Sequence, residues 1–140
     1  MLRKVSLAIT LIVLAVGHAN AQSAAARLAS IDYGTVLQEE DSRVTIYRSL
    51  LDSLDTTYLE SPQILADIAV TAQNHLNNEY GLSLPILSIL SDTNRIITPS
   101  KGPIPNYAEW IFAYVTMLGN GKSRDEAILD LKALANTLGY

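Results

Sequence analysis

Apolar residues recur at spacings of three and four in three stretches, and this periodicity constrains the fold more than any other feature. The first stretch comprises Val44, Tyr47, Leu51, Leu54 and Tyr58. The second comprises Leu65, Ile68, Ala69, Ala72 and Leu76, and the third Ala127, Leu131, Leu134 and Leu138. Such spacing gathers apolar side chains on one face of an α-helix, which turns once every 3.6 residues. The sequence therefore predicts three amphipathic helices.

Residues typical of helix ends border these stretches. The starts are marked by Asp41 with Ser42, by Ser61 with Pro62, and by Ser123 with Glu126. The last pair has the spacing of a capping box, in which each side chain binds a free backbone N–H group of the other residue. Gly81 and Gly139 follow the second and third stretches, where a left-handed residue ends many helices. The first helix is expected over residues 42–58.

Two further segments are apolar but less regular. A short helix is expected between Pro85 and Asn94, and a longer one over residues 107–118, which are apolar on almost every side. Asn106 with Glu109 resembles a capping box at the start of this longer helix. Because 110–115 also contains good strand formers, a buried strand remains an alternative there. We predict an all-α fold, a small bundle of four to five helices with 107–118 as the central apolar helix.

The first 21 residues have the three-part pattern of a secretory signal peptide. Arg3 and Lys4 form a cationic start, residues 5–16 are an almost unbroken apolar run, and Ala19 and Ala21 occupy the positions that a signal peptidase reads. A retained membrane anchor is the alternative, although a span needs about 20 apolar residues. We predict a signal peptide at 1–21, a loosely ordered N-terminal segment at 22–41 and a helical domain at 42–140. The cleaved protein would be periplasmic or secreted, with no integral membrane segment.

Charge and cysteine content narrow the function classes. The chain has a formal net charge of −4, and loss of 1–21 with its two cations and no acid would make it −6. An acidic chain without a Lys/Arg cluster is not expected to bind nucleic acid, which requires phosphate-neutralising charge. The chain contains no cysteine, so thiol catalysis and cysteine-ligated metals are excluded. Its stability must come from apolar burial.

No motif points to catalysis or to a cofactor. His75 is the only histidine after residue 21, and Glu79 lies one helical turn further on. Zinc needs three or four protein ligands, so we interpret this pair as surface residues and expect no metal. The chain has no G-x-S-x-G elbow and no complete phosphate-binding loop, and the sequence Gly119-Asn120-Gly121-Lys122-Ser123 is better explained as a turn. We therefore expect no cofactor.

The proline-rich segment 98–105 is the one sizeable loop, and we consider it a candidate binding site. Its Lys101 and Ile104, with Tyr107 and Trp110 of the following helix, are the candidate contact residues. The alternative for the two aromatic side chains is a place in the core. We predict an exported, non-catalytic protein of inhibitor, immunity or accessory type that binds another protein, with a second copy of this chain as one such partner. Two alternatives remain open: a small-molecule or lipid carrier with an inter-helical cavity, and a small carboxylate-dependent enzyme.

Overall fold

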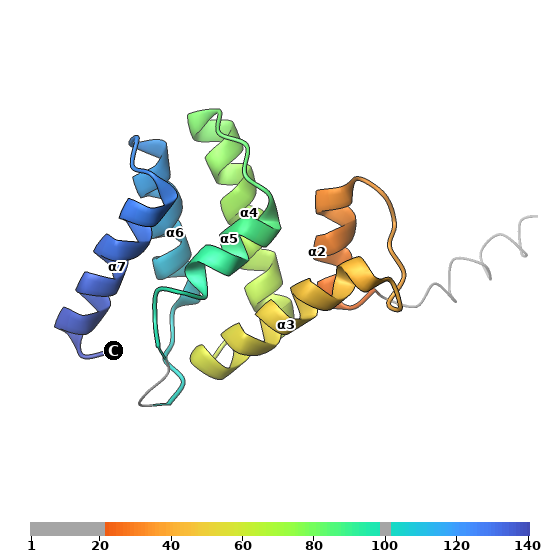
Figure 1. Cartoon of the computed structure of the whole chain (residues 1–140), viewed down its shortest axis with the longest axis horizontal. Helices are drawn as coiled ribbons and strands as arrows, with labels where there is room; N and C mark the ends of the chain where they lie inside the picture. Colours follow the sequence, from red (N-terminus) through yellow and green to blue (C-terminus); the bar gives the residue numbers. More distant parts are fainter. Residues whose placement is uncertain (1–21, 99–101) are drawn as a thin grey trace, which may run out of the picture.

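The computed structural model describes residues 22–98 and 102–140, and these form an all-α bundle (Figure 1). Its six helices are α2 (Ala24–Tyr33), α3 (Ser42–Thr57), α4 (Pro62–Tyr80), α5 (Ile86–Thr93), α6 (Tyr107–Gly119) and α7 (Arg124–Leu138). The all-α prediction is confirmed, and 107–118 is helical rather than a strand. The predicted signal peptide lies outside the described residues. No helix of the described part has both the length and the apolar content of a membrane span.

The predicted ends of α3, α4 and α7 are confirmed. The Asp41 side chain accepts a hydrogen bond from the backbone N–H of Arg43, and Ser61 accepts one from that of Ile64. Gly81 ends α4 in the left-handed conformation, with φ 66°. At α7, Ser123 and Glu126 form both hydrogen bonds of the capping box. Local sequence signals therefore set these ends.

The prediction of a loosely ordered segment at 22–41 is wrong. Residues 24–33 form helix α2, which packs on α3, α4 and α5. Its buried face consists mostly of alanines: Ala24, Ala25, Ala26, Leu28 and Ala29. Small side chains bury little area but let neighbouring helices approach closely, so a helix can pack without a stripe of large apolar residues. This helix also raises the number of helices above the expected four to five.

The short helix α5, rather than α6, occupies the place where the other helices meet. It contacts α2, α3, α4, α6 and α7, whereas α6 contacts only α4, α5 and α7 (Figure 1). Ile86, Ile89 and Leu90 of α5 are completely buried. The apolar helix α6 is largely buried, with only Glu109 and Thr116 exposed, and its last residue, Gly119, allows close contact with α4. A Cβ atom at Gly119 would lie 2.5 Å from ring atoms of Tyr80.

Three helices begin at carboxylates that are distant in the sequence. Asp32 of α2 accepts hydrogen bonds from the backbone N–H groups of Ile86 and Leu87, at 2.8 and 2.9 Å, and from the Tyr47 hydroxyl at 2.8 Å. Glu39 binds the N–H and hydroxyl of Ser23, both at 2.7 Å, at the start of α2. Carboxylates suit helix starts, where free N–H groups carry partial positive charge.

The third such carboxylate corrects the expectation for α6. Asn106 does not cap this helix through its side chain, and its backbone is left-handed with φ 72°. Instead, Glu60 Oε1 accepts hydrogen bonds from the N–H groups of Asn106 and Tyr107, at 2.8 and 3.0 Å. The predicted capping box of Asn106 with Glu109 is therefore replaced by a tertiary contact from the α3–α4 connection.

Candidate functional site

The predicted contact residues separate into buried and accessible groups. Tyr107 is fully buried, where its hydroxyl shares a 2.8 Å hydrogen bond with that of Thr93 and its ring contacts Tyr58. Burial raises the pKa of Tyr107 above its ordinary value. Trp110 is also buried, and its indole makes a T-shaped contact with the Tyr140 ring at 6.1 Å between centroids. Tyr107 and Trp110 thus belong to the core, and their side chains offer no contact surface in this conformation.

The loop lies against the end of α3. Ile104 donates from its N–H to the carbonyl of Thr57 and accepts from the N–H of Leu59, both at 2.9 Å. These two bonds form an isolated parallel bridge between Tyr58 and Ile104, and the Ile104 side chain is half-buried. The loop is therefore anchored at Ile104. Lys101 lies outside the described residues.

Exposed apolar side chains occur on the segments that end near this anchored loop. Leu59 is 66% exposed, and at the end of the chain Leu134, Leu138 and Tyr140 are 46%, 58% and 44% exposed. The loop, the end of α3 and the C-terminus lie at the same end of the bundle (Figure 1). We call Leu59, Ile104, Leu134, Leu138 and Tyr140 the loop-end surface.

This surface corrects one expectation for α7. Of the predicted stripe, Ala127 and Leu131 are buried, whereas Leu134 and Leu138 are exposed. Helix α7 packs only on α5 and α6, so the described bundle leaves these two leucines uncovered. The last two turns of α7 and Tyr140 carry one charged side chain, Lys132. Apolar exposure with little charge is the composition of the centre of a protein interface rather than of its rim.

Two buried oxygens lie near the anchored loop without a hydrogen-bond partner. They are the Tyr58 hydroxyl oxygen and Glu60 Oε2. Burial is the main cause of a raised pKa at Tyr58, and the nearby Tyr107 and Glu60 raise it further. Burial thus favours the neutral phenol, which can donate a hydrogen bond.

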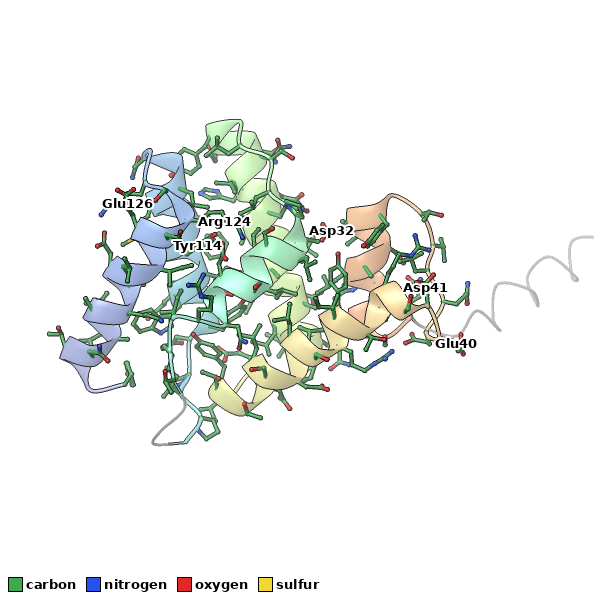
Figure 2. All side chains as sticks on the ribbon, in the orientation of Figure 1. Asp32, Glu40, Asp41, Tyr114, Arg124 and Glu126 are labelled. Atoms are coloured by element: carbon green, nitrogen blue, oxygen red, sulfur yellow. The ribbon has the colours of Figure 1, made fainter. Side chains whose placement is uncertain are left out.

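A second polar cluster connects α5, α6 and α7 away from the loop. The Asp92 side chain is only 5% exposed and binds Arg124 through two hydrogen bonds, Nε to Oδ2 at 2.6 Å and Nη2 to Oδ1 at 3.0 Å. The Tyr114 hydroxyl donates to the same carboxylate, and Arg124 and Tyr114 are labelled in Figure 2. The hydrogen bonds to Asp92 raise the pKa of Arg124, so its charge is permanent. Arg124 thus neutralises the buried carboxylate of Asp92, whose burial without a partner would be strongly destabilising.

The remaining chemical candidates are structural in this fold. His75 is half-buried, and its ring contacts those of Tyr80 and Phe112 at 5.8 and 5.7 Å between centroids. The described residues contain no group of three or more His, Asp or Glu side chains placed to hold a metal ion. The turn at 119–123 carries an ion pair between Lys122 and Asp130. Its lysine is thus engaged within the protein.

Sequence reasoning found the loop but missed the neighbouring exposed leucines. The spacing of Leu134 and Leu138 suggested a buried stripe, and no local signal shows that α7 lies at the edge of the bundle. The contact between the loop and Leu59 joins residues 45 positions apart. Searches of protein-family models, of curated proteins and of solved structures each find no match to this chain.

Proposed function

We propose that this protein is an exported, non-catalytic helical module that binds another protein through the loop-end surface. The single observation that carries the proposal is the exposure of four large apolar side chains at one end of the bundle, Leu59, Leu134, Leu138 and Tyr140. Grouped apolar exposure is unfavourable in water and is typical of surfaces that a partner covers. Export rests on the sequence pattern of residues 1–21.

The anchoring of the loop supports this role. Two backbone hydrogen bonds hold Ile104, and the flanking prolines Pro103 and Pro105 restrict the backbone. A residue that is already held by such bonds loses little conformational entropy on binding. In this proposal Tyr107 and Trp110 do not contact the partner; they are core residues that pack beneath the loop-end surface.

The test compares two leucine substitutions on the same helix. The double variant Leu134→Ser/Leu138→Ser changes the loop-end surface, whereas Leu129→Ser changes a leucine that is 65% exposed elsewhere on α7. Each tagged protein is used to capture proteins from the native extracellular or periplasmic extract. We expect a species retained by the wild type and by Leu129→Ser but lost with the double variant.

Circular dichroism serves as the control for folding. Both variants should keep the helical signal, because all three leucines are exposed. Equal retention of the same species by a folded double variant would remove the loop-end surface from the interface. Loss with Leu129→Ser alone would move the interface to the opposite side of α7.

A further inference from the structure

A second feature lies at the α6–α7 turn, away from the loop-end surface. An open depression of about 360 Å³ lies between the α4–α5 connection and this turn. Four leucines form its apolar walls: Leu76, Leu82, Leu84 and Leu118. Ser83, Gly121, Lys122, Ser123 and Arg124 complete the lining, which contains two cationic side chains and no carboxylate. Its volume is in the range of sites that hold small organic molecules.

Arg124 is fixed in place at this depression. Its Nε and Nη2 groups bind Asp92, which Tyr114 holds in turn, so the guanidinium cannot swing away freely. A guanidinium has five N–H donors; two bind Asp92 and one interacts with the Tyr114 hydroxyl, which leaves two for another acceptor. The Arg124 side chain remains 47% exposed. A positioned, permanently charged donor beside an apolar wall matches a ligand with a carboxylate at one end and an aliphatic chain at the other.

We propose that this depression binds a small monocarboxylate with an aliphatic chain. The leucines contact the chain, and the free N–H donors of Arg124 bind the carboxylate. Lys122 adds positive charge, although its ammonium group also binds Asp130. This site is independent of the protein interface proposed above, because the two lie on different parts of the molecule and share no residue.

The test is a titration of the 15N-labelled protein, without residues 1–21, followed by two-dimensional NMR. Octanoate is the probe, and 1-octanol and octylammonium are matched compounds that keep the chain and change the head group. We expect octanoate to shift the amide resonances of 82–84, 118 and 121–124. Because 1-octanol cannot form the charged hydrogen bond, its affinity should be lower than that of octanoate by roughly tenfold or more. Octylammonium should not bind.

Substitutions at exposed positions complete the test. Leu82→Glu places a negative charge in the apolar wall and should abolish the shifts, whereas Leu129→Glu, outside the lining, should leave them unchanged. Arg124→Lys keeps the charge but removes the planar group, and we expect weaker octanoate binding in the folded protein. Absence of shifts with octanoate would overturn the proposal. Equal affinity for octanoate and 1-octanol would also overturn it. So would equal binding of octanoate by the Leu82→Glu variant and the wild type.

Discussion

At the scale of single residues, burial separates leucines that the sequence alone treats alike. Leu131 and Leu129 lie two positions apart in α7, and the first is fully buried whereas the second is largely exposed. Residues two apart point to nearly opposite sides of a helix. Leu131 was predicted to be in the core from its spacing, and the structure confirms it.

We expect Leu131→Ala to lower the free energy of unfolding by about 2–5 kcal/mol, because it removes buried contacts and leaves a cavity. Leu129→Ala is the matched control and should change this energy by less than about 0.5 kcal/mol. Urea denaturation of both variants measures the difference. A loss below about 0.5 kcal/mol for Leu131→Ala would show that this side of α7 does not face the core.

Asp41 makes one contribution to stability that depends on pH. Its side chain accepts hydrogen bonds from the guanidinium and the backbone N–H of Arg43, and these lower the pKa of Asp41 from 3.8 to about 2. A carboxylate whose pKa falls on folding stabilises the protein above its unfolded pKa. This contribution is therefore complete above pH 3.8 and is lost as the pH falls towards 2.

We expect Asp41→Asn to melt at a lower temperature than the wild type at neutral pH. Asparagine caps helices about as well as aspartate, so the difference reports mainly the charge. Thermal melts over a pH series should show the two melting temperatures converging between pH 3.8 and 2. A gap that stayed constant over the whole series would contradict the role of the Arg43 contact.

At the scale of helices, the sequence predicts those ends that neighbouring residues determine. Ser61 and Ser123 lie beside the helices that they cap, so their signals are local. Glu60 lies 46 positions from Asn106, and Asp32 lies 54 positions from Ile86. Contacts at such separation depend on the fold and leave no local pattern. The sequence suggested no more than one helical turn around 24–28, in place of the full helix α2, because the buried alanines of this helix contrast weakly with its polar face.

The start of α6 offers a direct test of long-range capping. We expect Glu60→Ala to lower the free energy of unfolding by about 1–2 kcal/mol, the cost of losing a helix cap. Glu109→Ala removes the partner that local spacing suggested and should cost less than about 0.5 kcal/mol. Chemical denaturation distinguishes the two. A larger loss for Glu109→Ala than for Glu60→Ala would favour the local capping box.

At the scale of the whole molecule, the helix periods predicted the all-α bundle but not its arrangement. Helix α5 is short, yet it contacts all five other helices of the described chain. Its central place follows from how the longer helices pack around it, which periodicity does not encode. Periodicity likewise does not show which residues of the candidate site come together. The proline-rich loop was visible in the sequence, whereas Leu59, Leu134 and Leu138 join it only through the fold.

The start of the folded bundle bears on processing of the chain. Ser23 caps α2, and Glu39 binds its N–H and hydroxyl groups. We expect cleavage after Ala21, so that the exported protein begins at Gln22 and keeps this cap. N-terminal sequencing of exported protein measures the position. A chain that began at Met1 or Leu2 would indicate a retained anchor.

Site-specific photo-crosslinking tests most directly whether the loop-end surface binds a partner protein. A photoreactive amino acid replaces Leu138 in one protein and Leu129 in another, and both are illuminated in the native extract. Binding through the loop-end surface predicts a discrete crosslinked protein from position 138 that is absent from position 129. Equal crosslinking from both positions, or a discrete product from position 129 alone, would contradict binding through the loop-end surface.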